Sequence, residues 1–207
     1  MYSIKEIYKT IQGEGAQSGQ SAVFVRFSGC NLWSGKEKHR DDAICKFCDT
    51  DFVGTDGVNG GKYSIETLIT KIQELWDSEE EAYVVFTGGE PMLQLDQKLI
   101  SACKKVNFIT AIETNGTIKI DFDIDWICVS PKAGSELLVN KGNELKVVYP
   151  QKGINLNEFE KLDFEHFYLQ PLHNEKYDQN LKKTLKTIMK YPKWKLSLQT
   201  HKFIGVK

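Results

Sequence analysis

Three cysteines stand at positions where they could hold a metal centre. Cys45 and Cys48 form a C-x-x-C pair, and Cys30 lies upstream of them with fourteen residues between. The C-x-x-C spacing lets two thiolates converge on one centre, and an iron–sulfur cube held by three cysteines keeps one iron free for a substrate or cofactor. On the cysteines alone, a thiol redox pair or a zinc site completed by His39 remains equally open.

A second motif, Thr87–Pro91 with the sequence TGGEP, follows an apolar run of strand length. Its two glycines let the backbone approach a ligand closely, and Pro91 suits the start of a helix. A plain turn between a strand and a helix would use the same residues. The motif therefore indicates a ligand-binding site only when it is taken together with the three cysteines.

Arg26 is a third candidate, because it interrupts the apolar run Ala22–Phe27. A buried guanidinium needs an anionic partner, and a substrate carboxylate would offer a bidentate one. The alternative is an internal ion pair with Glu14 or Glu113. The other two cysteines, Cys103 and Cys128, lie in helical and strand patterns and are expected to be small core residues.

The elements that would position these residues alternate between strand and helix. Strand-length apolar runs are expected at 21–27, 83–87, 108–113, 126–130, 145–149, 167–170 and 195–199, and helices at 64–76, 93–106, 155–162 and 178–191. The glycine-rich segment 53–62 is expected to be a loop. This alternation predicts an α/β fold, a partial (β/α) barrel of about six mostly parallel strands with few helices. Polar residues end most of the runs, so one composite site is expected at the carboxyl ends of the strands.

Length, charge and apolar content narrow the class of protein. The 207 residues suit a single domain, 1–207, and a net charge of −1 gives no positive field for a nucleic-acid backbone. No apolar run is long enough to span a bilayer, so a membrane protein is not expected. An odd number of cysteines and the lack of an export signal indicate a cytoplasmic protein with free thiols.

The cysteine set and TGGEP together are similar to the radical S-adenosylmethionine superfamily. Further motifs make nearly the whole chain resemble the 7-carboxy-7-deazaguanine synthase family: IQGEG at 11–15, RFSGCNLW at 26–33, CKFCDT at 45–50, ETNG at 113–116, SPK at 130–132, LQP at 169–171 and QTHK at 199–202. The wide gap after the first cysteine departs from the commonest superfamily spacing. It indicates an insert near residues 31–44 that reshapes the cluster loop without changing its ligands.

The resemblance implies an activity and its cofactors. A [4Fe-4S] cluster on Cys30, Cys45 and Cys48 would cleave S-adenosylmethionine, and 6-carboxy-5,6,7,8-tetrahydropterin would contract to 7-carboxy-7-deazaguanine with loss of ammonia, on the route to queuosine. Thr50 would touch Mg²⁺, although a helix or turn cap is its ordinary role. The GGE strip would grip the methionyl amino group of S-adenosylmethionine. The cofactor-binding positions would be Gly89, Ser130, Pro131, Lys132, Gln170, Pro171, Leu172 and His173.

The resemblance also implies a set of substrate contacts. These are Ile11, Gln12, Gly13, Arg26, Thr87 and the terminal carboxylate of Lys207, with Glu14, Glu113, Asn115 and His201 as further candidates on the same surface. The implied partners are the small pterin substrate, an electron donor such as flavodoxin or ferredoxin, and a second copy of the chain in a homodimer.

Two rival functions are weighed against this one. A glycyl-radical activase would share the cluster and the GGE strip, but it has no need for Arg26 or the terminal QTHK segment. A zinc-binding interaction module would need His39 as the fourth ligand.

Overall fold

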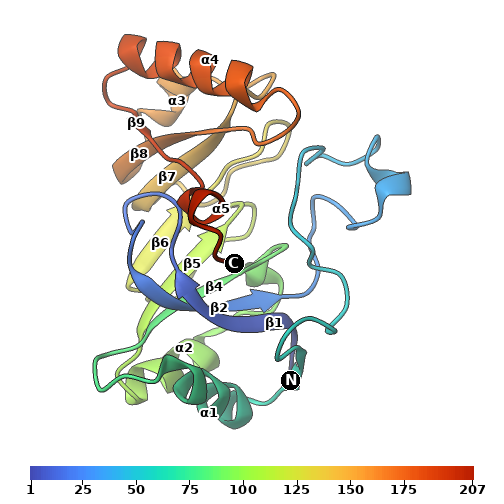
Figure 1. Ribbon diagram of the computed structural model, residues 1–207, viewed down its shortest axis with the longest axis vertical. Helices are drawn as coiled ribbons and strands as arrows, with labels where there is room; N and C mark the ends of the chain where they lie inside the picture. Colours follow the sequence, from blue (N-terminus) through green and yellow to red (C-terminus); the bar gives the residue numbers. More distant parts are fainter.

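A computed structural model describes residues 1–207, and a single curved sheet runs through it (Figure 1). The strand order is β3-β1-β2-β4-β5-β6-β7-β8-β9. The neighbours from β2 to β9 are all parallel, whereas β1 and β3 are antiparallel additions at one edge. The strands are β1 (Tyr2–Ile11), β2 (Ser21–Phe27), β3 (Gly61–Tyr63), β4 (Tyr83–Gly88), β5 (Ile109–Thr114), β6 (Trp126–Val129), β7 (Lys141–Tyr149), β8 (Asp163–Pro171) and β9 (Lys195–Leu196).

The helices begin where the sequence supplies caps. Ser64 and Thr67 form a capping box at the start of the first helix, and the Asp96 carboxylate accepts a hydrogen bond from the Leu99 amide at the start of the second. The α-helices are α1 (Ile65–Trp76), α2 (Gln97–Lys105), α3 (Leu156–Phe159), α4 (Tyr177–Lys190) and α5 (Thr200–Ile204), and the short 3-10 helices are η1 (Glu37–His39) and η2 (Pro91–Leu93). The longest helix, α4, has 14 residues, and none of the helices has the length and apolar character to traverse a bilayer.

The convex face of the sheet carries the apolar core. In β2, Val23, Val25 and Phe27 are fully buried in the larger apolar cluster, together with residues of α1 and α2. A second cluster lies among β7, β8, α3 and Trp194. Figure 1 shows α1 and α2 together at one end of the sheet and α3 and α4 at the other.

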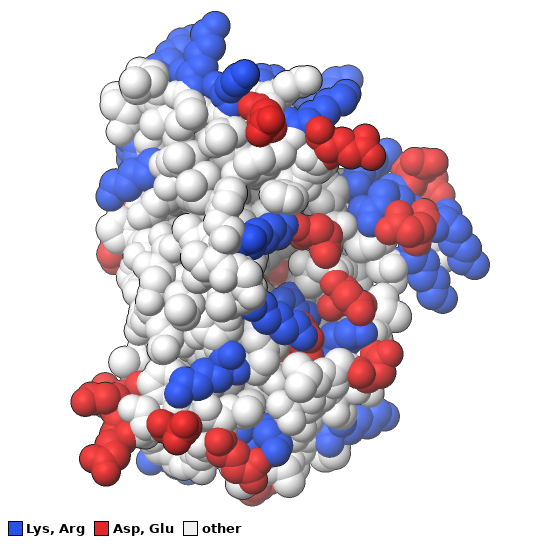
Figure 2. Space-filling view, viewed as in Figure 1, with Lys and Arg blue, Asp and Glu red and all other residues white.

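Alternate residues of each strand point to opposite sides of the sheet. The concave face therefore receives the residues that alternate with the core, and these include the polar ones. Phe24 and Arg26 of β2 lie on this side and line a cavity, opposite the core residues between them. A small apolar group of Ala22, Tyr83, Val85 and Ala111 lies apart from the two larger clusters. Figure 2 shows charged side chains of both signs around the hollowed side of the molecule and on a projecting loop.

The predicted α/β partial barrel is confirmed, with differences in its elements. The sheet has nine strands because β1 and β3 extend it at the antiparallel edge, and β3 begins at the end of the segment expected to be a loop. The expected helix at 93–106 is divided, since Asp96 caps α2 and so sets its start. The last expected strand is only two residues long, and the chain then forms α5.

Candidate active site

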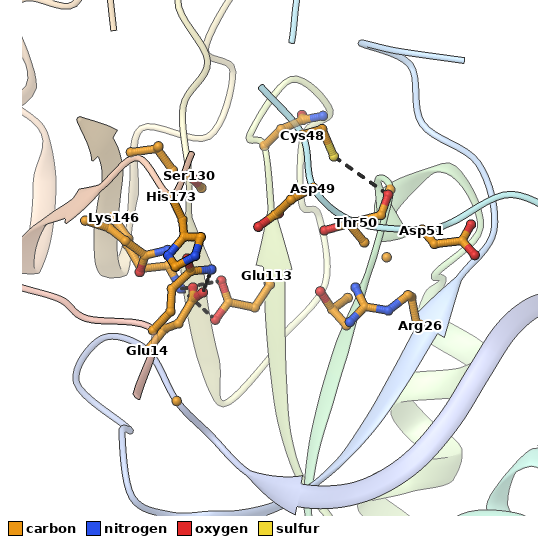
Figure 3. Close-up of a pocket in the computed structure, with 18 of the residues that line it drawn as sticks. Glu14, Arg26, Cys48, Asp49, Thr50, Asp51, Glu113, Ser130, Lys146 and His173 are labelled. Atoms are coloured by element: carbon orange, nitrogen blue, oxygen red, sulfur yellow. Dashed lines mark hydrogen bonds and ion pairs between the residues drawn. The ribbon is translucent and has the colours of Figure 1, made fainter. Parts of the chain in front are cut away.

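A cavity of about 590 Å³ opens at the carboxyl ends of the parallel strands (Figure 3). Its walls are the concave face of the sheet, the loop that carries the cysteines, and the C-terminal segment. All but one of the residues predicted for the site line this cavity. The exception, Pro131, is buried between Ser130 and Lys132, which do line it.

The three cysteines lie in one wall of the cavity. Cys45 is buried, Cys30 and Cys48 are half-buried, and none is in a disulfide. The Leu32 amide points at the Cys30 sulfur, 3.4 Å away. Burial raises the pKa of Cys30. The hydrogen bond between the other two thiols lowers the pKa of Cys48, so this wall favours at least one thiolate.

The TGGEP strip packs directly on the first cysteine. The Glu90 amide donates to the Gly29 carbonyl over 2.9 Å. A Cβ at Gly89 would lie 2.2 Å from the Gly29 carbonyl oxygen and 2.7 Å from the Cys30 Cβ. Glycine is therefore required at this position for the strip and the cysteine loop to approach each other.

The Glu90 carboxylate does not face the cavity. It is fully buried and accepts hydrogen bonds from the Met92 amide (2.9 Å), the Thr114 hydroxyl (2.7 Å) and the Asn115 amide (2.7 Å). Of the GGE strip, which the resemblance implies grips the methionyl amino group, only the two glycines line the cavity. The Glu90 side chain ties the end of β4 to the end of β5.

The zinc alternative finds no support in the side-chain arrangement. The His39 ring bonds the Ser34 hydroxyl at 2.8 Å. No group of three or more His, Cys, Asp and Glu side chains converges on a single ion position. A cube binds its cysteines through separate iron atoms, so three thiols that share a cavity wall without meeting at one point fit a cluster better than a lone zinc ion.

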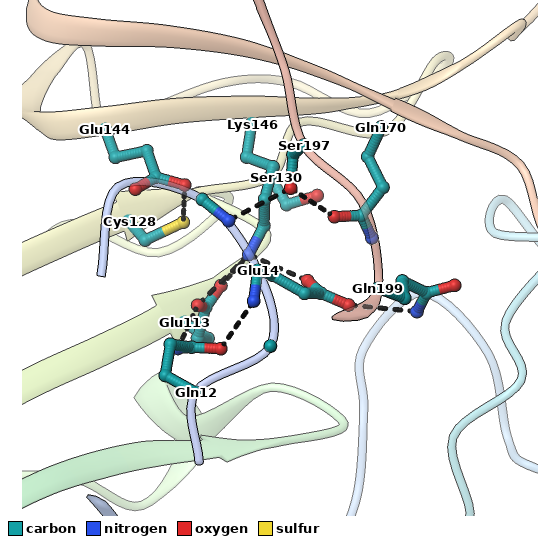
Figure 4. A network of polar contacts seen from close by, with 12 residues as sticks. Gln12, Glu14, Glu113, Cys128, Ser130, Glu144, Lys146, Gln170, Ser197 and Gln199 are labelled. Carbon is teal, nitrogen blue, oxygen red and sulfur yellow. Dashed lines mark hydrogen bonds and ion pairs between the residues drawn. The ribbon is translucent and has the colours of Figure 1, made fainter. Parts of the chain in front are cut away.

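A charged network lies across the concave face (Figure 4). The Lys146 ammonium lies 2.9 Å from the Glu14 carboxylate and 3.0 Å from the Glu113 carboxylate, and its side chain is 3% exposed. Burial alone would raise the pKa of Glu14 and lower that of Lys146, but their mutual attraction reverses both shifts. Gln199 donates to the Glu14 carboxylate and Gln12 to the Glu113 carboxylate. Both carboxylates are therefore held in fixed positions beside the ammonium.

Lys146 was missed by sequence reasoning although a signal was present. In β7 the sequence from 144 to 148 is ELKVV, so Glu144 and Lys146 alternate with the core residues Leu145 and Val147. Two polar residues at alternate positions of a buried strand mark a polar inner face. Glu144 is also buried and accepts a hydrogen bond from the Ala16 amide.

Arg26 has an internal partner, as the alternative interpretation allowed, but a different acid from the two considered. Its Nε donates to the Glu6 carboxylate over 2.9 Å and its Nη2 to the Tyr8 hydroxyl over 2.9 Å. The alternative of a pair with Glu14 or Glu113 is wrong, because both of these carboxylates contact Lys146. The antiparallel register of β1 and β2 places Glu6 opposite Arg26, a pairing that the sequence did not reveal.

The positions predicted to bind the cofactor lie along the ends of β6 and β8. The Lys132 ammonium donates to the Ser130 hydroxyl over 2.7 Å, and burial lowers the pKa of Lys132. Gln170 accepts a hydrogen bond from the Ser197 hydroxyl, 2.8 Å away, and the His173 ring packs in a tilted arrangement on Tyr177, with 4.8 Å between the ring centroids.

The C-terminal segment closes the mouth of the cavity. The Thr200 amide donates to the Gly13 carbonyl over 2.8 Å, and Lys202 pairs with Asp49 of the cysteine loop at 2.8 Å. The backbone oxygen of Lys207 accepts from the Thr10 hydroxyl over 2.7 Å, and its ammonium contacts Glu6. The segment thus joins the N-terminal strand to the cysteine loop, and burial lowers the pKa of its His201.

Comparison with known proteins finds a matching superfamily and relatives that match along nearly the whole chain. The model of the radical SAM superfamily matches residues 40–147, a range that includes two of the three candidate cluster ligands, Cys45 and Cys48, and TGGEP, and that starts after Cys30. The chain is 54% identical over 99% of both chains to the 7-carboxy-7-deazaguanine synthase of Burkholderia multivorans. It is 51% identical to that of Bradyrhizobium diazoefficiens, over 100% of this chain and 99% of the relative.

A solved structure supports the same relationship. The crystal structure of QueE from Escherichia coli superposes with a TM-score of 0.74 at 26% identity, over 95% of this chain and 93% of that one. Three cysteines and a glycine strip thus open into one cavity, in a chain whose full length matches one enzyme family. The chain belongs to the 7-carboxy-7-deazaguanine synthase family of the radical S-adenosylmethionine superfamily.

Proposed function

We propose that this chain converts 6-carboxy-5,6,7,8-tetrahydropterin to 7-carboxy-7-deazaguanine with loss of ammonia. The observation that carries the proposal is the composition of the cavity at the carboxyl ends of the strands. One wall holds the three cysteines, and the opposite face holds a guanidinium and two carboxylates. A small substrate with a carboxylate at one end and hydrogen-bond donors at the other is complementary to this arrangement.

Members of the superfamily use a [4Fe-4S] cluster and S-adenosylmethionine, which together supply one-electron chemistry for removing a substrate hydrogen. Cys30, Cys45 and Cys48 would hold the cluster. The backbone of Gly89, the polar groups of Ser130–Lys132 and the segment Gln170–His173 would hold S-adenosylmethionine. These groups position the cofactor and keep water from the reacting atoms.

The substrate carboxylate would be bound by Arg26. Its Nε and Nη2 are engaged by Glu6 and Tyr8, which fixes the plane of the guanidinium and leaves Nη1 for a new acceptor. The buried pair therefore orients Arg26 rather than replacing its role in binding. Thr87 lies beside it, because β2 and β4 pair Arg26 with Thr87.

The pyrimidine end of the pterin would meet the charged network. Glu14 and Glu113 accept hydrogen bonds, and the pterin amino group and ring N–H donate them. The attraction of Lys146 lowers the pKa of Glu14, so this carboxylate is an acceptor only. Gln12, Asn115, His201 and the carboxylate of Lys207 would complete this end of the site.

A magnesium ion would sit at Thr50, between the cysteine loop and the substrate. The neighbouring carboxylates Asp49 and Asp51 pair with Lys202 and Lys5, each at 2.8 Å. With those carboxylates engaged, the ion would depend on the Thr50 hydroxyl, water and a substrate oxygen. Turnover that falls on removal of Mg²⁺ and returns on its addition would support this position, and turnover unaffected by the removal would contradict it.

The remaining proposals concern the oligomeric state, the cellular location and the electron donor. Residues 1–207 would act as one radical SAM domain, working as a homodimer in the cytoplasm with electrons from a flavodoxin or ferredoxin. Light scattering from the eluting protein tests the dimer, because a solution mass near 23.6 kDa would contradict it.

The substrate assignment is tested by comparing two pterins under anaerobic conditions. The reconstituted enzyme receives S-adenosylmethionine, a strong reductant, and either the carboxypterin or the same tetrahydropterin without its carboxylate. We expect turnover of the carboxypterin only, because Arg26 then has its anionic partner. Equal turnover of both pterins would show that the carboxylate is not recognised.

A further inference from the structure

The insert near residues 31–44 folds back onto the cysteine loop through Arg40. In Figure 1 this segment projects from the sheet and carries η1. The Arg40 guanidinium lies over the Trp33 ring, 4.0 Å from its centroid, and forms an ion pair with Glu37. Trp33 is three residues after Cys30, so Arg40 stacks on the segment that carries the first cysteine.

The same guanidinium also contacts the backbone of the turn that carries the other two cysteines. Its Nη1 donates to the carbonyl of Lys46 over 3.0 Å and to the carbonyl of Cys48 over 3.2 Å. These carbonyls belong to the C-x-x-C turn. Arg40 therefore joins the two halves of the cysteine loop, which are far apart in sequence.

Backbone contacts show that the two halves meet at this point. The amides of Ile44 and Cys45 both donate to the Leu32 carbonyl, over 3.1 and 3.3 Å. Guanidinium suits the junction because it is planar, stacks on an aromatic ring and donates to two acceptors at once. The side chain of Lys38, in the same insert, is exposed and has no hydrogen bond or ion pair.

A buried donor beside this junction lacks an acceptor. Trp33 Nε1 is the one buried side-chain nitrogen or oxygen in the structure with no hydrogen-bond partner. The ring is 7% exposed, packs edge-on against Phe52 and lines the cavity with the three cysteines. An unpaired buried N–H is costly, so an acceptor outside the protein chain is expected.

We propose that Arg40 and Trp33 form a clasp that positions the three cysteines for the cluster, with Trp33 Nε1–H donating to a sulfur of the bound centre. The inference rests on the proposed cluster at Cys30, Cys45 and Cys48. Arg40 is a positioning residue, because it acts through the backbone of the cysteine loop. This role would explain the long insert. The insert lengthens the cysteine loop, and its own Arg40 binds the two parts of that loop together.

The clasp is tested by the rate at which a chelator removes iron from the reconstituted protein, followed by the visible absorbance of the cluster. Arg40→Gln is expected to speed the loss about tenfold or more, since charge-assisted hydrogen bonds and the stack are removed together. Arg40→Lys should also lose iron faster than the unaltered protein, because an ammonium cannot stack and bridge in the same way. Lys38→Gln, the matched control, should lose iron at the unaltered rate.

Trp33→Phe tests the donor with a readout that folding alone would not move. Phenylalanine keeps an aromatic ring, smaller than the indole, beside Arg40 and Phe52 and removes the N–H donor. Hydrogen bonds to cluster sulfurs stabilise the reduced, more negative state, so the reduction potential is expected to become more negative. A potential equal to that of the unaltered protein would remove Trp33 Nε1 from the proposal.

The outcomes separate this inference from the proposed function. Iron loss from Arg40→Gln at the rate of the Lys38→Gln control, or full rescue by Arg40→Lys, would overturn the clasp while leaving product formation by the unaltered enzyme in place. An unaltered protein that binds no iron and sulfide would overturn both. Circular dichroism of each variant checks that the fold is retained.

Discussion

Replacing Lys146 with Met should destabilise the protein strongly although the side chain is similar in size. Lys146 is the cation between two carboxylates, Glu14 and Glu113, and it is almost completely buried. Met removes the charge and leaves the carboxylates close together on the concave face. The substitution therefore removes one partner of a buried ion pair and leaves the opposite charges without their partner.

The magnitude follows from the burial of the three side chains. Breaking a buried pair by removing one partner costs about 3–5 kcal/mol. The two carboxylates are each 20% exposed toward the cavity, so partial solvation favours the lower end, about 3 kcal/mol. For a chain of this length that loss lowers the melting temperature by about 6–12 °C.

The loss of stability in Lys146→Met should depend on pH, and the direction of this dependence follows from the pKa of Glu14. In the unaltered protein the pKa of Glu14 lies below its ordinary value of 4.5. Its stabilising contribution is therefore complete above pH 4.5 and is lost only as the pH falls through the lower, folded value. In Lys146→Met, burial raises the pKa without opposition from the lysine, so protonation relieves the penalty as the pH is lowered from about 8 to about 5.5.

Anaerobic thermal unfolding of both proteins at these two pH values measures the effect. We expect Lys146→Met to be much less stable than the unaltered protein at the higher pH, and the difference in stability to be smaller at the lower pH. His201 interacts electrostatically with both Glu14 and Lys146, so both proteins carry His201→Gln in this comparison, which removes its titration. Lys146→Arg, which keeps the charge, should recover much of the stability, and a deficit in Lys146→Met below about 1 kcal/mol, or one that does not change with pH, would refute the buried-pair interpretation.

Three further predictions concern the site. Cys30→Ala should lose both cluster and activity, whereas Cys103→Ala should keep the cluster because that thiol is on the buried face of α2, in the core; analysis of iron and sulfide decides between these outcomes. Arg26→Lys should raise the KM for the carboxypterin about ten- to a hundredfold with cleavage of S-adenosylmethionine retained, since lysine loses the fork, and an unchanged KM would make Arg26 purely structural. Deleting Lys207 should raise the KM on the order of a hundredfold, while Lys207→Ala keeps a terminal carboxylate and should have a much smaller effect; untouched kinetics after the deletion would exclude the terminus from the site.

The sequence predicted the parallel part of the sheet well, because its strands are nearly continuous apolar runs. It failed for β1, where Lys5 and Glu6 make the segment look exposed. Both side chains are buried because they are paired, Lys5 with Asp51 and Asp56, and Glu6 with Arg26. Such pairings depend on which residues the fold brings together, and periodicity does not contain that information.

The candidate site was predicted from motifs better than its internal contacts were. Motif residues mark the ends of strands, and strand ends in a parallel sheet meet at one edge. The partners of Arg26 and the burial of Glu90 depend on strand register and on the packing of the turn after β4. Lys146 is the clearest omission, since its alternation with core residues was visible in the sequence.

The most direct test of the central claim is product analysis of a single anaerobic reaction. The reaction contains the reconstituted enzyme, the carboxypterin, S-adenosylmethionine and a strong reductant, and both the heterocyclic product and ammonia are measured. The account predicts 7-carboxy-7-deazaguanine and ammonia in equal amounts, with neither formed by Cys30→Ala. A protein that carries a full cluster and cleaves S-adenosylmethionine, yet forms neither product from the carboxypterin, would contradict it.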